Sequence, residues 1–232
     1  MTRAETAYHG ELGEYFATLA TDNASNAHTD RPAMLKLAGD VGGLRVLDVG
    51  CGAGHYAAEL RDRGAADVVG VEGSKTLLSA ARKRLGEGVE LHQHDLEEPL
   101  TFLKDASFDL AVMALVYHHV EEREQLLAEL RRVLRPGATL LVSTTHPAGE
   151  WTWFGGSYFA DERVEAALDG GFTIRYWRMT LEKFLGELLG AGFVLEQLVE
   201  PRAVEEAREL DPRRYEKTHT VPYFLAVRLR RL

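Results

Sequence analysis

The chain alternates between short apolar runs and longer segments in which apolar residues recur at helical spacing. Short runs that predict β-strands occur near residues 45–49, 68–72, 89–92, 109–114 and 139–144. Segments that predict helices lie between them, near residues 54–63, 75–85 and 121–133. Strands that alternate with helices are typical of βαβ units, so we expect a doubly wound, mainly parallel α/β sheet.

The C-terminal part predicts one more helix and two more strands, which bring the sheet to seven. The helix covers about residues 180–190, with an apolar stripe that includes Phe184 and Leu188 and with Thr180 as its N-cap. Strands are predicted near 194–199 and 223–229. Sheets of this type bind ligands at the carboxyl ends of their strands, near the switch in strand order.

Two regions lie outside the predicted sheet. Residues 1–34 predict a helix followed by a polar loop, which we expect to form an N-terminal cap. The insertion at 146–179 contains all three tryptophans, within an aromatic-rich, glycine-hinged stretch at 151–177. We expect this insertion to cover a substrate as a lid, and a hydrophobic cluster that only packs is the alternative. The chain then forms a single domain, with a ligand-binding core at 35–145 and a C-terminal completion of the sheet at 180–232.

Composition and charge limit which binding partners and which cellular compartment we expect for this chain. The 232 residues carry a formal charge of −9, which argues against a nucleic acid or an anionic membrane as partner. The single cysteine, Cys51, excludes internal disulfides and a cysteine-ligated metal, and it suits a reducing cytosol. No apolar run is long enough to span a bilayer. We therefore expect a cytoplasmic monomer or homodimer without a metal ion.

The most informative stretch follows the first predicted strand. That strand ends at Gly50, Gly52 and Gly54, and a helix follows at once. Glycines at such a corner allow positive φ and let a ligand approach backbone N–H groups. Glu72 ends the second strand eighteen residues beyond Gly54, where its carboxylate can accept both hydroxyls of a ribose. The pattern predicts an adenosine-containing cofactor.

Asp48 narrows the identity of that cofactor. It precedes Gly50 by two residues, and no Arg or Lys lies between Arg45 and Arg61. A fixed carboxylate beside a diphosphate is unfavourable, whereas S-adenosylmethionine (SAM) has no phosphate and carries a sulfonium and an ammonium. The acidic loop therefore favours SAM, and a purely structural turn capped by Asp48 is the alternative.

With these residues placed, the chain resembles the class I (Rossmann-like) SAM-dependent methyltransferases, with a methyltransferase type 11-like domain. Five segments carry the resemblance in the family's order, over about residues 35–145, and these are 46–54, 69–74, 94–96, 108–120 and 130–138. The resemblance implies a Rossmann-like fold, SAM as cofactor and a set of cofactor-binding residues. That set is Asp48, Gly50, Cys51, Gly52, Gly54, Glu72, Gly73, Asp95, Leu96 and Ala114. The family's tail is variable, so the methyl acceptor stays open.

Methyl transfer from a sulfonium requires alignment of the acceptor and, for some acceptors, a base. Histidine titrates near neutrality, so His119 is the first candidate for the base and His146 is the second. Tyr117 and His118 are candidates for binding the substrate beside them. Trp153 and Tyr158 are further substrate-binding candidates, on the predicted lid. A structural role is the alternative for each of these side chains.

The segment from Ala114 to Tyr117 departs from the Asn/Asp-Pro-Pro-Tyr/Phe motif of methyltransferases that act on nucleobase amines or on glutamine. A small organic acceptor is therefore expected, with oxygen, nitrogen and carbon all open as the methylated atom. An NAD(P)-dependent reductase and a non-catalytic SAM-binding regulator are the competing hypotheses.

Overall fold

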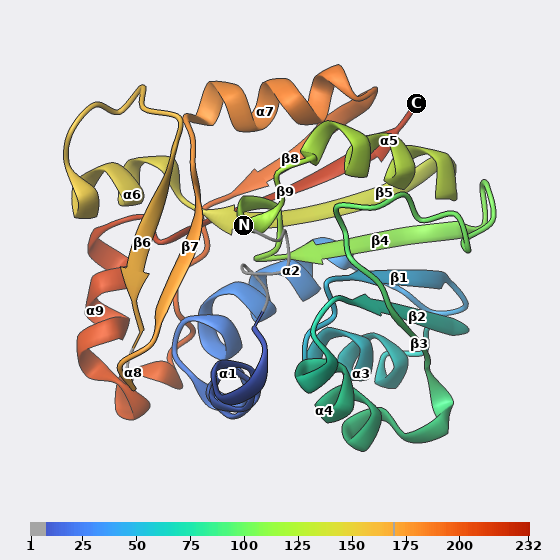
Figure 1. Ribbon diagram of the computed structural model, residues 1–232, viewed down its shortest axis with the longest axis horizontal. Helices are drawn as coiled ribbons and strands as arrows, with labels where there is room; N and C mark the ends of the chain where they lie inside the picture. The colour runs from blue at the N-terminus through green and yellow to red at the C-terminus, as the bar shows by residue number, and fades with distance from the viewer. Residues whose placement is uncertain (1–7, 169) are drawn as a thin grey trace.

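A computed structural model describes residues 8–168 and 170–232, and the predicted strands form one seven-stranded sheet (Figure 1). The strand order is β3-β2-β1-β4-β5-β9-β8. The strands are β1 (Arg45–Val49), β2 (Asp67–Glu72), β3 (Glu90–Gln93), β4 (Phe108–Ala114), β5 (Leu134–Thr145), β8 (Phe193–Val199) and β9 (Phe224–Arg231). Only β9 runs antiparallel to its neighbours in this sheet. The doubly wound, mainly parallel α/β fold is confirmed.

The order of the strands places a switch point between β1 and β4. Leu47 of β1 lies opposite Val69 of β2 on one side and opposite Ala111 of β4 on the other. The chain proceeds from β1 outward to β3 and then returns to begin β4 on the opposite side. A crevice between the carboxyl ends of β1 and β4 follows from this topology.

Helices cover both faces of the sheet (Figure 1). One face packs against α5 (Arg123–Val133) and α7 (Leu181–Gly190), and the other against α2 (Arg31–Ala38), α3 (His55–Asp62) and α4 (Lys75–Leu85). The expected N-cap of α7 is present, because Thr180 Oγ1 accepts the Lys183 N–H at 3.0 Å. Ser74 caps α4 in the same way, and its Oγ accepts the Leu77 N–H at 3.2 Å. Burial on both faces explains why the central strands read as continuous apolar runs.

Several elements differ from the predictions. The N-terminal cap contains α1 (Gly10–Asp22), but the expected polar loop includes a short π-helix, η2 (Asn26–Asp30), that leads directly into α2. The charged segment before β9 holds two short helices, α8 (Ala207–Leu210) and α9 (Pro212–Thr220). Pro136 and Gly137, which are residue types common in turns, lie in an irregular start of β5.

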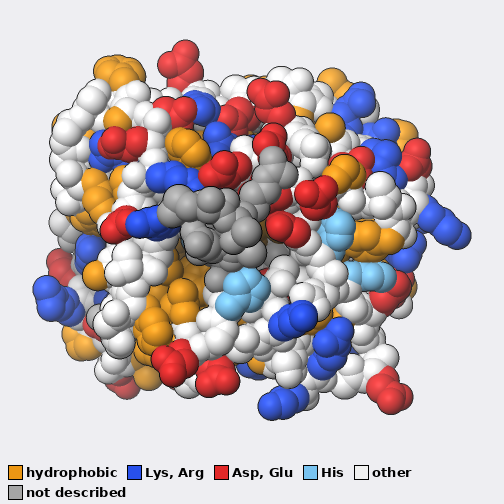
Figure 2. Space-filling model, in the orientation of Figure 1, with side chains coloured by type: hydrophobic (Ala, Val, Ile, Leu, Met, Phe, Trp, Pro, Cys, Tyr) orange, Lys and Arg blue, Asp and Glu red, His pale blue; other side chains and the backbone are white. Residues whose placement is uncertain are grey.

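The aromatic-rich insertion is more ordered than its sequence predicts. It consists of α6 (Pro147–Phe154) and an antiparallel hairpin of β6 (Glu162–Ala167) and β7 (Thr173–Arg178). Phe172 lies in the connection between β6 and β7, directly before β7, and contacts Tyr15 of α1 with ring centroids 5.2 Å apart. Figure 2 shows hydrophobic side chains gathered in this view between the hairpin and α1. In the part of the chain that the structure describes, no helix has the length and apolar character needed to cross a membrane.

Candidate functional site

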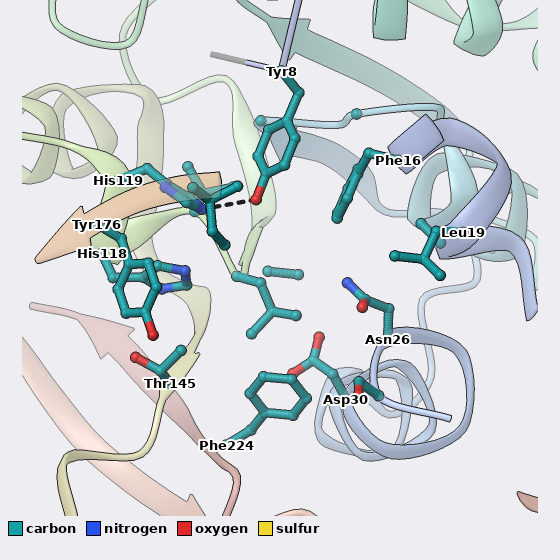
Figure 3. A pocket seen from close by; sticks show the side chains of 18 of the residues that line it. Tyr8, Phe16, Leu19, Asn26, Asp30, His118, His119, Thr145, Tyr176 and Phe224 are labelled. Carbon is teal, nitrogen blue, oxygen red and sulfur yellow. Dashed lines mark hydrogen bonds between the residues drawn. The ribbon is translucent and has the colours of Figure 1, made fainter. Parts of the chain in front are cut away.

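A cavity of about 460 Å³ opens at the carboxyl ends of the central strands (Figure 3). Its floor is the loop after β1 together with the ends of β2 and β4. The N-terminal segment lines one side, and α6, β6 and β7 line another. The volume falls within the range of small-ligand sites. Elements far apart in the sequence therefore enclose one site at the predicted edge of the sheet.

The glycine loop has the conformation that its sequence predicts. Gly50, Gly52 and Gly54 all have positive φ, at +69°, +55° and +78°. The N–H groups of Gly50 and Cys51 both donate to Val71 O, at 2.8 and 3.0 Å, which ties the loop to β2. A Cβ on Gly50 would lie 2.5 Å from Cγ2 of Val116, whereas a Cβ on Gly52 would meet no protein atom within 4 Å. Gly52 also lines the cavity, so the loop leaves room there for a ligand.

Glu72 is held rigidly at the mouth of this loop. Its Oε2 accepts the Gly52 N–H at 2.8 Å and its Oε1 accepts the Ser74 N–H at 2.7 Å. Burial raises the pKa of this carboxyl, while the two backbone N–H groups act in the opposite direction. Each oxygen keeps a further lone pair, so both can still accept a hydroxyl. The geometry suits the predicted ribose contact.

Asp48 lies beneath the loop and not on the cavity wall. Its side chain is 2% exposed, and burial raises its pKa to about 7. Oδ2 has no hydrogen-bond partner among the described residues. Asp48 therefore acts on the cavity through its charge and through the loop above it. Gly54 is also absent from the wall, because it begins α3 and packs against Leu85.

The other predicted cofactor residues lie around the cavity. Cys51 and Gly73 line it beside Glu72, and Leu96 lines it at the end of β3 together with the exposed Asp95. The Cys51 sulfur packs near Gly70, and burial raises the pKa of its thiol, as expected for a packed residue.

The wall also contains a strained backbone position after β4. Ala114 is followed there by Leu115, whose φ is +57°. A leucine in this conformation is strained, and the Leu115 N–H is held by Ser143 O at 3.0 Å.

The two histidines after β4 take different positions on the wall. Nδ1 of His118 lies 3.0 Å from Thr144 Oγ1, and Nε2 of His119 lies 3.4 Å from the hydroxyl of Tyr8 (Figure 3). Burial lowers the pKa of His118 well below its ordinary value and lowers that of His119 to about 4. Both rings are therefore neutral at physiological pH. A base with so low a pKa is weak, so this environment argues against His119 as the group that removes a proton.

Two of the predicted substrate-binding residues do not reach the cavity. Tyr117 is fully buried on the other side of its loop, where its hydroxyl donates to Glu187. The hydroxyl of Tyr158 accepts the Leu181 N–H at 3.2 Å. Neither side chain lines the cavity, and both hydroxyls are engaged in contacts within the fold. Trp153, in contrast, does line the cavity.

His146, the second candidate for the base, is also absent from the wall. Its Nδ1 accepts the Ala148 N–H at 3.1 Å and caps α6, and its Nε2 lies 3.0 Å from Glu200. Because Nδ1 accepts a hydrogen bond, Nε2 carries the proton and donates to Glu200. Both nitrogens are occupied by structural partners, which argues against the predicted catalytic role of His146.

Sequence reasoning missed a buried carboxylate on the acceptor side of the cavity. Glu150 of α6 is 2% exposed and lines the wall. The hydroxyl of Tyr176, from β7, lies 3.0 Å from one carboxylate oxygen and 3.1 Å from the other. Burial raises the pKa of Glu150 to about 7. The sequence shows Glu150 only as a polar residue in an aromatic stretch, and its burial depends on the hairpin that folds over it.

A second missed group comes from the N-terminal segment. Asp30 is 1% exposed, and burial raises its pKa to about 6. The hydroxyl of Tyr56 donates to its Oδ2, while Oδ1 has no hydrogen-bond partner among the described residues. Figure 3 shows the carboxylate directed toward the space between Asn26 and Phe224. Arg31, the next residue, also lines the cavity.

The charges of the wall distinguish between the candidate cofactors. Its described residues include the carboxylates Asp30, Glu72, Asp95, Glu97 and Glu150, against the guanidinium groups of Arg31 and Arg214 only. An acidic wall fits a cationic nucleoside ligand and opposes a diphosphate. The open space at Gly52 and the unpaired oxygen of Asp30 add a place for a nucleoside and a partner for an ammonium. Among residues 8–168 and 170–232, no group of three or more potential ligands is arranged for a metal ion.

Comparison with known proteins agrees with this geometry. A family model described as a methyltransferase domain matches residues 47–142. The ubiquinone/menaquinone biosynthesis C-methyltransferase UbiE of Desulfotalea psychrophila is 33% identical over 178 residues, which cover 68% of this chain and 68% of that protein. The methyltransferase GfsG of Streptomyces halstedii is 31% identical over 156 residues, which cover 59% of this chain and 55% of that protein.

A solved structure extends the similarity to most of the fold. The crystal structure of a SAM-dependent methyltransferase from Mesorhizobium loti superposes with a TM-score of 0.70 at 26% identity. The superposition covers 86% of this chain and 96% of that one. The similarity therefore includes elements on both sides of the residues that the family model matches.

Proposed function

Because the chain belongs to the class I SAM-dependent methyltransferases, we propose that it transfers the methyl group of SAM to a small organic molecule bound between the glycine loop and the aromatic insertion. The observation that carries the proposal is one continuous cavity with two chemically different ends. The end at Glu72 offers carboxylate oxygens and glycine backbone. The end at α6 and β7 offers aromatic side chains and one buried acid.

We assign the cofactor to the end at the glycine loop. Glu72 would hold the ribose, and Asp95 with Leu96 would contact the adenine. Asp30 and Arg31 offer opposite charges suited to the ammonium and carboxylate of the methionine part. When bound there, SAM supplies an activated methyl group. The residues of this chain orient it and exclude water.

The acceptor is assigned to the end lined by Trp153, Phe154, Tyr176 and Phe224. Aromatic walls bind a small apolar body, and few polar groups remain to orient it. The charge of −9 supports a small acceptor, because a polyanion such as RNA would be repelled. His118 and His119 would contact the substrates as neutral side chains. We also propose that the insertion covers the bound acceptor as a lid.

The test is a screen of small acceptors with SAM that carries a radiolabelled methyl group. Methylated product that forms with the parent protein, together with saturable SAM binding by calorimetry, supports the proposal. Label that enters RNA or protein and no small molecule contradicts the assignment of the acceptor. Absence of SAM binding contradicts the assignment of the cavity.

A further inference from the structure

The acceptor end of the cavity contains a buried carboxylate that forms no ion pair with a described residue. Glu150 is 2% exposed, and its carboxylate is hydrogen-bonded by the hydroxyl of Tyr176 and by the side chain of Thr145. The nearest guanidinium of β7 is engaged elsewhere, since Arg178 bonds to Glu162 at 2.6 Å and to Gly155 O at 2.9 Å. Ionising a buried carboxylate that has no ion-pair partner is costly, and such groups occur mainly at functional sites.

We propose that Glu150 is the group that accepts the proton of the methyl acceptor, that Tyr176 positions it, and that the acceptor is a phenol or enol hydroxyl. The proposal rests on the function proposed above and specifies the chemistry of its acceptor end. The carboxylate lies on the cavity wall, within reach of the side chains of Tyr176 and Thr145. Two donors do not use all the lone pairs of a carboxylate, so its oxygens can still accept a hydrogen bond from a ligand.

The methyl group and the proton of this reaction pass between SAM, the acceptor and Glu150 alone. The bond between the methyl carbon and the sulfonium breaks with its electron pair left on sulfur, the acceptor oxygen forms the new bond to carbon, and the hydroxyl proton passes to the Glu150 carboxylate. Transfer in a closed cavity needs such an internal proton acceptor, because water is excluded. A carboxyl whose pKa lies near neutrality suits that task better than the neighbouring imidazoles, whose pKa values are lowered by burial.

Groups from several elements face Glu150 or its partner. Tyr176 and Arg178 come from β7, Thr145 ends β5, and His146 at the N-cap of α6 contacts Glu150 through its backbone carbonyl. The His118 and His119 rings of η4 (Tyr117–His119) lie 5.3 and 6.1 Å from the Tyr176 ring. Tyr223 before β9 and Tyr8 before α1 act on Tyr176 through their charges when ionised. Burial lowers the pKa values of His118 and His119 and raises those of Tyr8 and Tyr176, so none of these four groups changes charge near pH 7. Among the described groups around the acceptor end, Glu150 is the one whose pKa lies at about 7.

A hydroxyl acceptor fits this arrangement better than an ammonium. A bound ammonium needs a carboxylate that stays ionised, whereas a carboxyl that titrates near neutrality can take a proton and return it to solvent after turnover. The aromatic side chains around Glu150 also suit a flat ring that carries one hydroxyl.

The experiment compares Glu150→Gln and Tyr176→Phe with the parent and with Glu165→Gln. Glu165 is an exposed glutamate of the same insertion and pairs with Arg175, away from the cavity. Acceptors are matched pairs of phenols and anilines, supplied with radiolabelled SAM. We expect the parent to methylate phenols with a rate that falls below pH 7. Glu150→Gln should lower that rate by about 10²–10⁴-fold and remove the pH dependence, with SAM affinity within about twofold of the parent. Tyr176→Phe should move the pH midpoint upward, because the ionised carboxylate loses its donor.

A second readout does not depend on turnover. In protein labelled with ¹³C at the glutamate side-chain carboxyl, one resonance should titrate near pH 7 and be missing from Glu150→Gln. It should shift when 4-chlorophenol binds to the complex with S-adenosylhomocysteine. Full turnover of Glu150→Gln, label only in the anilines, or no response to the phenol would overturn the inference while SAM binding by the parent still supported the proposed function. A parent that binds no SAM would remove the proposed function itself.

Discussion

At the scale of single residues, Gly50 and Gly52 share positive φ but meet different surroundings. In both, an alanine would be strained by about 1–2 kcal/mol from the left-handed backbone alone. At Gly50 the added Cβ would also lie 2.5 Å from Val116, so Gly50→Ala should lower the free energy of unfolding by more than that strain. At Gly52 the added methyl meets no protein atom but projects from the cavity wall, so Gly52→Ala should mainly weaken SAM binding, by about tenfold.

Urea denaturation and calorimetry separate these two effects. Gly86 has a φ of +63° with no protein atom near its missing Cβ, and it lies away from the cavity. Gly86→Ala should therefore cost the same backbone strain as Gly52→Ala and leave SAM affinity unchanged. Equal SAM affinities for Gly52→Ala and Gly86→Ala would show that the space at Gly52 is not used by the cofactor.

Glu72 and Asp95 should contribute unequally to the free energy of SAM binding. Glu72→Ala removes a buried acceptor of two ribose hydroxyls, so the affinity for SAM should fall by about 1–3 kcal/mol. Asp95 is exposed, so Asp95→Ala should cost less. Isothermal calorimetry measures both, and circular dichroism checks that each variant is folded. An unchanged affinity in Glu72→Ala would mean that the ribose is held elsewhere.

At the scale of elements, an aromatic contact joins the insertion to α1 beside the cavity. Tyr15 and Phe172 lie 5.2 Å apart between ring centroids. Loss of this contact should loosen the hairpin, so Tyr15→Ala and Phe172→Ala should each raise the dissociation rate of S-adenosylhomocysteine several-fold. The double variant should match either single one, because both remove the same contact.

Stopped-flow fluorescence of the tryptophans in the insertion follows that dissociation. Phe159 belongs to the same insertion but is 78% exposed, so Phe159→Ala serves as the matched control and should leave the rate unchanged. Additive effects of the two substitutions would show that the rings act separately.

The sequence predicts the central sheet well because its elements follow hydrophobic periodicity. The helix predicted at 75–85 agrees with α4 (Lys75–Leu85), since its N-cap and apolar face are both visible in the sequence. The hairpin was missed because β6 buries only Val164 among its fully described positions and carries charges on the opposite side. Helix α9 was missed because only Tyr215 and Thr218 of it are buried, too few for a recognisable stripe.

The site was predictable where one short motif positions the chemistry. The glycine loop and Glu72 follow from the local sequence, because the loop and the end of β2 are adjacent strand ends. Glu150 and Asp30 were missed because an acid in a polar stretch gives no sign that distant elements will bury it. Conversely, His146 carries the side chain expected of a base, but the cap of α6 and Glu200 already occupy both of its nitrogens.

At the scale of the whole molecule, the acidic cavity wall should decide which nucleotide stabilises the fold. SAM and S-adenosylhomocysteine should raise the unfolding temperature, by an amount equivalent to about 2.7 kcal/mol at a hundredfold excess over the dissociation constant. NADH should not, because its diphosphate would face Glu72 with Asp48 beneath it. Differential scanning fluorimetry provides the comparison, and stabilisation by NADH alone would contradict the assigned cofactor.

The buried acids also predict how SAM binding depends on pH. At the cofactor end, burial raises the pKa of Asp30 to about 6 and that of Asp48 to about 7. In the free protein these carboxyls therefore hold protons that an ordinary acid has already lost at pH 6.5. A sulfonium and an ammonium that enter the cavity favour the ionised forms and lower these pKa values, so binding should release protons.

It follows that the affinity for SAM should rise between about pH 6 and pH 8 and level off above that range. Calorimetry at pH 6.5 in two buffers of different ionisation enthalpy counts the protons released, and the count should approach zero at pH 8.5. S-adenosylhomocysteine lacks the sulfonium charge, so it should release fewer protons and show a shallower pH dependence. Proton uptake, or equal release with the two ligands, would mean that the sulfonium does not interact with these acids.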